Sequence, residues 1–405
     1  MKTDGTKPKM DKISMRLDAW RTRMELAQKN EHYFFNQPIQ EIRGGARVVV
    51  GGREMLMFAS YSYLGLIGHP KINAAAKAAV DKYGSGTHGV RMLAGTLGIH
   101  TELEETIAQF KETESAVTFS SGYITNVTAV STMVGRDDVV VSDKLNHASI
   151  VDGCVLSGAT FVRFRHNDMD DLELCLQRLS PEVTKLVVVD AVFSMDGDII
   201  NLPKVVELCR KYGAWLMVDE AHSLGALGEN GHGIEEHFGL GNVIDLKMGT
   251  LSKTIPSMGG YLAGSKDLIR MFRHAARPFV FSAALAPAQA AAAKAAFEVI
   301  LEEPERIEAL RQNAKRFVSG FKQLGFDTMQ TETAIIPLLC GPDESAYEMA
   351  KHCHRENVFV LPIVSPAVAE GLARLRATVT SAHTSEEIDM ALTAFESAGK
   401  KAAVI

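Results

Sequence analysis

The chain lacks the segments that carry a protein into or across a membrane. No uninterrupted apolar run in its 405 residues approaches the roughly 18 residues that a spanning helix needs. Residues 1–8 carry charges, but the apolar segment typical of a signal peptide does not follow them. We therefore expect a soluble, cytoplasmic protein without a membrane span.

Paired cysteines, basic excess and metal-binding spacings are also missing. The five cysteines form no C-x-x-C motif and are odd in number, so we expect free thiols in a reducing compartment. Lys and Arg total 43 against 49 Asp and Glu, a net charge of −6 that gives no reason to expect nucleic acid as a partner. His232 and His237 lack an H-E-x-x-H arrangement, and we expect no metal.

The chain does contain a regular alternation of helical and β-like stretches. Such alternation predicts an α/β fold, with a mostly parallel sheet covered by helices on both faces. Ligands bind beyond the carboxyl ends of the strands in sheets of this kind. The strand-like runs are 116–119, 138–142, 161–165, 185–190, 216–219, 245–249 and 260–263.

The length of the chain indicates more than one compact core. We expect an N-terminal helix and β pair over 1–58, a large cofactor-binding domain over 59–286 and a smaller α/β domain over 287–405. The last boundary is placed where the chain becomes rich in alanine and helical, after Pro287.

A lysine and an aspartate stand at the ends of two successive β-like runs. Lys253 follows Asp219 by 34 positions, and His222 lies three positions after Asp219. Pyridoxal phosphate (PLP) needs such a pair, because a lysine forms a Schiff base with its aldehyde and a carboxylate keeps its pyridine nitrogen protonated. His222 could reach the phenolic oxygen of the same ring.

Small polar residues at the neighbouring strand ends could hold a phosphate. The stretch 120–123 lies between a strand and a helix, where free N–H groups bind phosphate, although a simple turn with a serine N-cap is equally compatible. Thr250 and Ser252 place two hydroxyls beside Lys253. His147 also follows a strand and could stack on a flat ring.

Two further patterns were weighed for ligand binding. The stretch 374–379 alternates like a strand, and one of its arginines, Arg374 or Arg376, could fork onto a carboxylate; two surface arginines are the alternative. The glycines of 84–89 match G-x-G-x-x-G but follow a helix instead of a strand, so we reject a dinucleotide site.

Together these stretches resemble the α-oxoamine synthases, PLP enzymes with the aspartate-aminotransferase fold (fold type I). The likeness extends from about Asp18 to the C-terminus and is closest to the soluble bacterial serine palmitoyltransferases. The segments that carry it are 83–87, 91–96, 147–154, 162–167, 193–198, 218–223, 249–253 and 276–283.

The resemblance implies catalytic roles at the matching positions. Lys253 would bind PLP covalently, and His147 would stack on its ring. Asp219 would bind the ring nitrogen and His222 the phenolic oxygen. Arg376 matches the arginine that receives the carboxylate of the amino acid.

Further contacts are implied around the cofactor. Because the active sites of the family form at a homodimer interface, Tyr61 and Ser282 would reach into the site of the partner subunit. Ser62 stands in a segment where the family usually has an asparagine near the substrate. The remaining residues implied to contact PLP, mostly at its phosphate, are Ser121, Gly122, Tyr123, Ser194, Thr250 and Ser252.

The reaction implied is a decarboxylative Claisen condensation of an amino acid with an acyl-CoA thioester, giving an α-amino ketone, CoA and CO₂. Serine with a long-chain acyl-CoA is the preferred pair, because Ser252 before the lysine is typical of serine palmitoyltransferases. Glycine or alanine, or an acyl-carrier-protein thioester, is the alternative, since Ser62 leaves the amino acid open. An aminotransferase and a non-catalytic partner subunit are less favoured readings, and Lys253 with Asp219 argues against the second.

Overall fold

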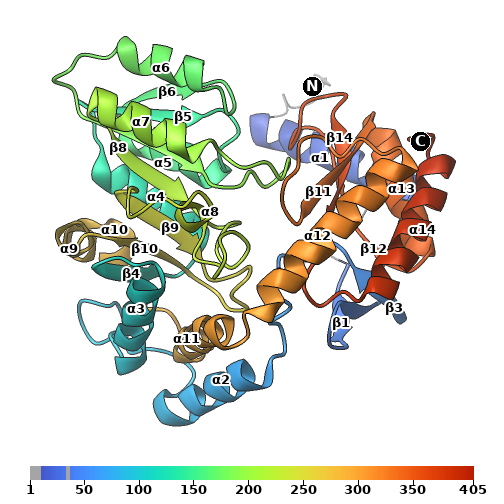
Figure 1. Ribbon diagram of the computed structural model, residues 1–405, viewed down its shortest axis with the longest axis horizontal. Coiled ribbons are helices and arrows are strands. Elements are labelled where there is room, and N and C mark those ends of the chain that lie inside the picture. The colour runs from blue at the N-terminus through green and yellow to red at the C-terminus, as the bar shows by residue number, and fades with distance from the viewer. Residues whose placement is uncertain (1–10, 33–36) are drawn as a thin grey trace, which may run out of the picture.

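A seven-stranded sheet forms the centre of the larger of two lobes (Figure 1). In the computed structural model, which describes residues 11–32 and 37–405, its order is β4-β10-β9-β8-β7-β5-β6. Only β10 runs antiparallel to its neighbours in this sheet. The strands are β4 (Ser115–Phe119), β5 (Val139–Asp143), β6 (Thr160–Phe164), β7 (Lys185–Asp190), β8 (Trp215–Asp219), β9 (Leu246–Thr250) and β10 (Gly260–Gly264).

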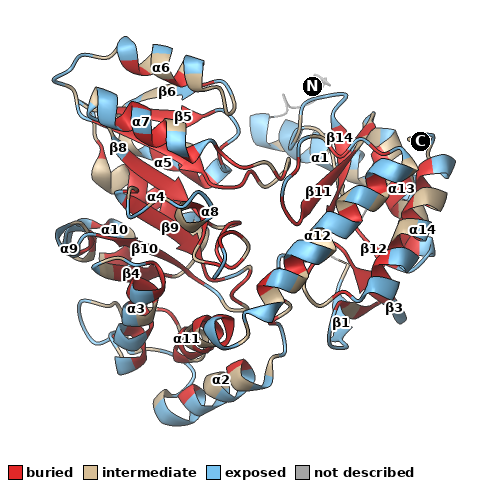
Figure 2. Cartoon of the chain, in the orientation of Figure 1, coloured by how far each residue is buried: buried red, intermediate tan, exposed pale blue. Residues whose placement is uncertain are grey.

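The predicted mostly parallel sheet is confirmed, and its burial explains why the strands were visible in the sequence. Every residue of β5, β7 and β9 is buried (Figure 2). Alternate residues enter two hydrophobic clusters: Val187 belongs to one, and Leu186 and Val188 belong to the other. A strand covered on both faces must be apolar at consecutive positions, which produces the continuous apolar runs.

Helices cover the two faces of this sheet (Figure 1). The helix α11 packs against α2 and α3, and α4 packs against α5. The helices of the larger lobe are α2 (Pro70–Tyr83), α3 (Gly98–Phe110), α4 (Gly122–Met133), α5 (Ala148–Ser157), α6 (Met169–Gln177), α7 (Leu202–Tyr212), α8 (Ile234–His237), α9 (Lys266–Ala275), α10 (Arg277–Val280) and α11 (Pro287–Glu302).

The smaller lobe combines the two ends of the chain. Its four-stranded sheet has the order β1-β2-β3-β12, and its three-stranded sheet has the order β11-β14-β13. The strands are β1 (Ile39–Ile42), β2 (Arg47–Val50), β3 (Arg53–Met57), β11 (Ile335–Gly341), β12 (Val358–Phe359), β13 (Pro362–Ile363) and β14 (Ala373–Thr378). The remaining helices are α1 (Lys12–Lys29), α12 (Glu305–Leu324), α13 (Asp343–Arg355) and α14 (Ser385–Lys401).

The pairing of β3 with β12 joins the N-terminal β pair to the C-terminal part of the chain. The domain boundaries expected at 58 and 286 stay predictions. Residues 1–8, on which the expectation about a signal peptide rested, lie outside the described residues. No helix within 11–32 and 37–405 is long and apolar enough to cross a membrane.

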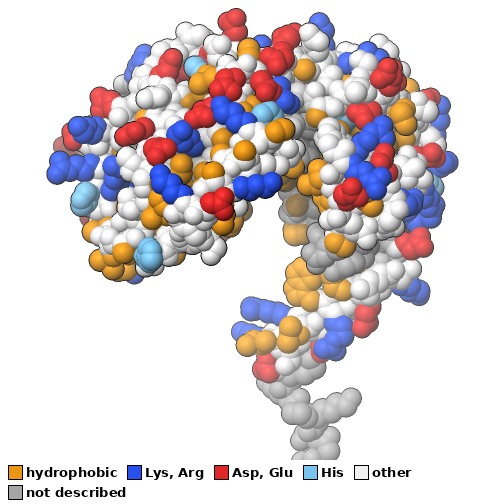
Figure 3. All heavy atoms as spheres, turned by 90° about the horizontal axis from the view of Figure 1, so that it is seen from below, with side chains coloured by type: hydrophobic (Ala, Val, Ile, Leu, Met, Phe, Trp, Pro, Cys, Tyr) orange, Lys and Arg blue, Asp and Glu red, His pale blue; other side chains and the backbone are white. Residues whose placement is uncertain are grey.

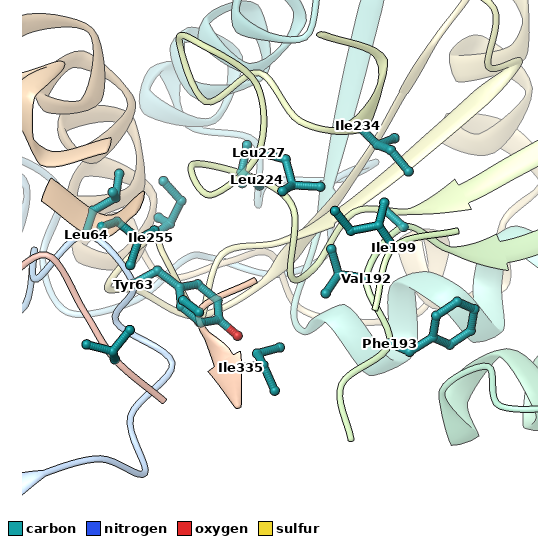
Figure 4. Packing of buried hydrophobic residues seen from close by; sticks show 14 of the residues in the cluster. Tyr63, Leu64, Val192, Phe193, Ile199, Leu224, Leu227, Ile234, Ile255 and Ile335 are labelled. Carbon is teal, nitrogen blue, oxygen red and sulfur yellow. The ribbon is translucent and has the colours of Figure 1, made fainter. Parts of the chain in front are cut away.

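The two lobes share a continuous hydrophobic core near the ends of the strands. Figure 4 shows Tyr63 beside Ile255 and Val192 of the larger lobe and Ile335 of the smaller lobe. Viewed from below, the surface is hollowed between the lobes, and α1, which has no buried residue, projects from the body (Figure 3).

Candidate active site

A cavity of about 280 Å³ lies beyond the carboxyl ends of β5, β7, β8 and β9. We call it the cofactor cavity. It brings together ten of the residues singled out in the sequence, from five separate segments of the chain: Ser121, Gly122, Tyr123, His147, Ser194, Asp219, His222, Thr250, Ser252 and Lys253.

Asp219 is buried at the end of β8 and is held as an acceptor of hydrogen bonds. Its Oδ2 accepts from Asn126 Nδ2 at 2.6 Å, and its Oδ1 accepts from the N–H of Ala221 at 2.8 Å. Hydrogen bonds donated to both oxygens fix the orientation of the carboxylate. Asp219 is therefore suited to stabilise a protonated ring nitrogen.

A hydrogen-bonded chain connects Asp219 with His147. Asn126 Nδ2 also donates to Ser149 Oγ at 2.9 Å, and Ser149 Oγ lies 2.7 Å from Nδ1 of His147. The backbone N–H of His147 donates to Asp190 Oδ2 at 3.0 Å. The imidazole and the carboxylate are thus fixed relative to one another by residues that are themselves buried.

Asp190 adds a second carboxyl group beside Asp219, since the two residues are partners in the register of β7 and β8. Burial, and then the charge of Asp219, raise the pKa of Asp190 well above its ordinary value. Burial beside Asp219 therefore favours the neutral form of Asp190.

Lys253 is partly buried, and its Nζ lies 2.8 Å from His222 Nε2. Burial lowers the pKa of Lys253 to about 8, although Asp219 and Asp190 act to raise it. Burial and the nearby Lys253 charge lower the pKa of His222 well below its usual range, so this imidazole is neutral. A lysine with this pKa has a substantial neutral fraction near neutral pH, which is what attack on an aldehyde requires.

Tyr63 completes this row of hydrogen bonds. Its hydroxyl lies 2.6 Å from Nδ1 of His222, and burial raises the pKa of Tyr63 to about 12. When Nε2 of His222 accepts from the Lys253 ammonium, Nδ1 carries the ring proton and donates to the tyrosine oxygen.

The start of α4 forms the other end of the cofactor cavity. Ser121 caps this helix by accepting from the N–H of Ile124 at 3.2 Å, and the first N–H groups of a helix are free to bind an anion. A Cβ at Gly122 would lie 2.8 Å from Thr250 Oγ1, so only glycine brings this backbone so close. Thr250 Oγ1 lies 2.9 Å from Ser252 Oγ, which places two hydroxyls at the same point.

The two arginines of β14 have different partners. Arg374 Nη1 forms an ion pair with Asp196 Oδ1 at 2.6 Å. Arg376 Nε donates to the carbonyl oxygen of Ser194 at 2.5 Å, but its Nη2 is buried without a hydrogen-bond partner among the described residues. Arg376 thus has a free donor for a carboxylate, and Arg374 has a structural partner.

Tyr61 lies near Lys253 and Arg376 of its own chain. Its ring lies 5.7 Å from Lys253 Nζ and 4.9 Å from the guanidinium carbon of Arg376. The expectation that Tyr61 also reaches the site of a partner subunit stays a prediction. Ser282 precedes Ala283, which forms a bridge with Val90, and does not line the cofactor cavity; its role at a dimer interface stays a prediction.

Ser62 lies just outside the cofactor cavity. It is 6% exposed, and its hydroxyl has no hydrogen-bond partner among the described residues. It lines a neighbouring cavity that also reaches Lys253.

Four residues of the site were not assigned a role from the sequence: Tyr63, Asn126, Ser149 and Asp190. Asn126 lies four positions after Gly122 and therefore on the same face of α4, a helical spacing that could have indicated it. Asp190 ends a buried strand, as Asp219 does. Nothing in the sequence indicates the contact between Tyr63 and His222.

This fold and site agree with a known class of proteins. Residues 53–395 match the family model of class I and II aminotransferases, and the chain belongs to that family. Within it, the chain is a PLP-dependent acyltransferase of the α-oxoamine synthase kind, because its relatives are enzymes of that kind.

The individual comparisons divide between two such enzymes. The chain is 44% identical to the 8-amino-7-oxononanoate synthase of Thermoanaerobacter pseudethanolicus, covering 91% of this chain and 93% of the relative. It is 42% identical to the serine palmitoyltransferase of Sphingobacterium spiritivorum, covering 94% and 95%. The solved serine palmitoyltransferase of Sphingomonas wittichii superposes with a TM-score of 0.95 at 33% identity, covering 98% and 100%.

The residues present fit PLP, as the sequence predicted and the family confirms. The start of α4 with Thr250 and Ser252 suits its phosphate, Asp219 its ring nitrogen and Lys253 its aldehyde. When bound, PLP supplies an electron sink for the electron pair left at the Cα of an amino acid.

Proposed function

We propose that Lys253 is the covalent anchor and the proton acceptor of a decarboxylative condensation between an amino acid and an acyl thioester. The observation that carries this proposal is the pairing of a lysine of lowered pKa with a buried arginine whose Nη2 is free. Arg376 would hold the carboxylate of the amino acid, and Lys253 would take the proton from its Cα. Asp219 would balance positive charge on the cofactor, and His147 would cover one face of its ring.

The condensation balances without a further reactant. The Cα carbon forms a bond to the thioester carbonyl carbon, and the C–S bond breaks to release CoA. The amino-acid carboxylate leaves as CO₂, and a proton returns to Cα from Lys253. The product is an α-amino ketone.

For the amino acid, the relatives favour the alternative over serine, since several of the most similar curated proteins bear the name 8-amino-7-oxononanoate synthase. In that product the amino group is on the carbon next to a methyl group, so the amino acid consumed is alanine. We therefore propose alanine first.

Serine is the second candidate. It is supported by the 42% identity to a serine palmitoyltransferase, by the close superposition on solved enzymes of that name and by Ser252 beside the lysine. Ser62, near the lysine, has a free buried hydroxyl, which is compatible with either amino acid.

A panel of amino acids tests the proposal. The PLP-loaded enzyme is given alanine, serine or glycine, and exchange of the Cα proton is measured in D₂O without a thioester. The productive amino acid should exchange fastest and should then release CoA and CO₂ in equal amounts when an acyl-CoA is added. Transfer of the amino group to give a 2-oxo acid, without CO₂, would contradict the synthase and indicate an aminotransferase.

A further inference from the structure

Three cavities lie in a row from the cofactor-binding residues into the smaller lobe. The cofactor cavity shares Ser252 and Lys253 with a second cavity of about 470 Å³, which we call the entry cavity. The entry cavity shares Ala59, Ser60, Ser62 and Ile67 with a third one of about 210 Å³. This third cavity, the apolar cavity, lies between the first strands and the segment that follows β12.

The apolar cavity is suited to a hydrocarbon. Its wall is formed largely by aliphatic and aromatic side chains, among them Ile42, Val48, Met57, Phe359 and Leu361. Val48, Met57 and Phe359 are buried and form part of one hydrophobic cluster. A ligand gains binding free energy in proportion to the apolar surface that it buries against such a wall, so a polar ligand gains little there.

Arg47 is the one Lys or Arg among the described residues of this wall, and its charge is already compensated. Arg47 Nη1 lies 2.8 Å from Glu54 Oε1, and its Nε lies 2.8 Å from Glu387 Oε1. Arg43 beside it pairs with Glu41 and with Glu54. Two arginines meet three glutamates in this partly exposed cluster, so neither arginine is left unpaired for a further carboxylate at the end of a ligand.

Ser62 supplies an independent indication of a ligand at the junction of the entry and apolar cavities. Its side chain is buried and its hydroxyl lacks a partner among the described residues, yet it lines both cavities. A buried hydroxyl without a partner costs free energy, which a carbonyl oxygen at the junction would recover. The thioester carbonyl is the group expected there, because the carbon that reacts must come close to Lys253.

We infer that the apolar cavity binds the hydrocarbon chain of the acyl donor and that this chain ends without a charge. The inference rests on the proposed synthase reaction and refines it. The donor implied by the name 8-amino-7-oxononanoate is a seven-carbon acyl group that ends in a carboxylate. The cavity selects against that donor, so the protein combines an amino acid such as alanine with an uncharged acyl chain.

Two donors of equal length test the charge directly. Heptanoyl-CoA and pimeloyl-CoA both carry seven acyl carbons and differ only in the terminal carboxylate. With the PLP-loaded enzyme and its best amino acid, kcat/KM measured by CoA release should favour heptanoyl-CoA by about tenfold or more, because an unpaired carboxylate is costly to bury. Equal use of the two donors, or a preference for pimeloyl-CoA, overturns the inference.

Substitutions of the glutamates test whether the charged cluster causes the preference for heptanoyl-CoA. Glu54→Gln frees Arg43 and Arg47 from their shared carboxylate and should narrow the heptanoyl to pimeloyl ratio several-fold, roughly the worth of one charge-assisted contact. The matched control is Glu396→Gln, which removes a glutamate that pairs with Lys400 on α14, outside the cavity, and should leave the ratio unchanged. An equal change in both variants overturns the assignment.

A filling variant tests whether the chain passes through the shared wall. Ile67, which is 44% exposed and lines both cavities, tolerates a larger side chain without overpacking the core. Ile67→Trp should lower the kcat/KM for palmitoyl-CoA relative to that for acetyl-CoA by about tenfold, since it narrows the passage. Met390→Trp, on the exposed face of α14, is the control and should not change this ratio.

The outcomes separate the inference from the function on which it rests. If no donor releases CoA with any amino acid, the proposed function fails and the inference fails with it. If condensation proceeds but Ile67→Trp leaves the palmitoyl to acetyl ratio at its wild-type value, the synthase stands and the apolar cavity is not the site of the chain.

Discussion

Two regions of the larger lobe place lysines in different electrostatic surroundings. Lys111 Nζ lies 2.6 Å from Glu220 Oε2, and Lys247 Nζ lies 2.5 Å from Glu235 Oε2, with both lysine side chains 2% exposed. Lys253, in contrast, has no carboxylate within ion-pair distance in the described part of the chain, and its nearest polar neighbour is His222. We call the first group the paired lysines.

The difference is produced by residues that are adjacent in sequence. Asp219 and Glu220 follow one another at the end of β8, so they point in opposite directions. Glu220 meets Lys111, whereas Asp219 enters the cofactor cavity. The ion pair between Glu220 and Lys111 contributes to stability, whereas Asp219 remains available to a ligand in the cofactor cavity. One strand end therefore serves both purposes.

The largest expected effect comes from removing the unpaired lysine. Lys253→Ala should lower the rate of CoA release by roughly 10²–10⁴-fold, the usual contribution of a positioned acid–base group. The unfolding midpoint should remain close to that of the wild type, because no ion pair is broken. Borohydride should fix PLP to the wild type and to the exposed control Lys77→Ala, but not to this variant. Label on another lysine would contradict the assignment.

Removing one of the paired lysines should affect stability instead of the rate of the reaction. Lys111→Met leaves Glu220 buried without its cation and should lower the free energy of unfolding by about 3–5 kcal/mol. Urea titration of the apoprotein measures this loss. The double variant Lys111→Met with Glu220→Gln should recover part of the lost free energy of unfolding. A Lys111→Met protein of wild-type stability would contradict the distinction between the two regions.

The arginines of β14 extend the same comparison with a smaller effect. Arg376→Ala should raise the KM of the amino acid by a factor that corresponds to about 1.5–3 kcal/mol, since a charge-assisted contact is lost. Arg374→Ala should instead lower stability, because Asp196 loses its partner. Steady-state kinetics with the amino acid and the thioester varied separately distinguish these outcomes. An unchanged KM in Arg376→Ala would place the carboxylate elsewhere.

The smallest expected effect is on the pH dependence of stability. The pKa of Lys253 is lowered in the folded state, so above about 8 the unfolded chain holds a proton that the folded chain has released. Stability therefore rises with pH between about 8 and the ordinary lysine value, by about 1 kcal/mol from pH 8 to pH 9. Denaturant titrations of the wild-type apoprotein and Lys253→Met should diverge by this amount. Parallel curves would contradict the lowered pKa.

The fold and the central residues of the site could be predicted from the sequence because both follow from buried strands. Runs such as that of β7 are apolar at every position, and the polar residue that ends each run necessarily stands at the ligand-binding edge. Asp219 and Lys253 were found in this way, and their family was recognised from the segments around them.

The remaining features of the site depend on contacts between distant segments of the chain, which no local sequence pattern encodes. The turn from Ser60 to Tyr63 brings the ring of Tyr61 over Lys253, a contact between residues almost 200 positions apart that no local pattern indicates. Asn126 and Ser149 matter because they connect Asp219 with His147 across two helices. The expected preference for serine depends on single residues such as Ser252, whereas the selection proposed for the acyl donor involves the lining of a whole cavity.

The attachment of Arg376 to the larger lobe has a consequence for which molecules can react. Ser194 and Asp196 bind the two arginines of β14, and a Cβ on Gly197 would collide with the Ile335 carbonyl, so the lobes are locked at this seam. The span from Arg376 to Lys253 is consequently fixed before any ligand arrives. With the roles proposed for Arg376 and Lys253, a fixed span would accept an amine and a carboxylate separated by one carbon, and it would reject simple amines and longer amino acids by geometry alone.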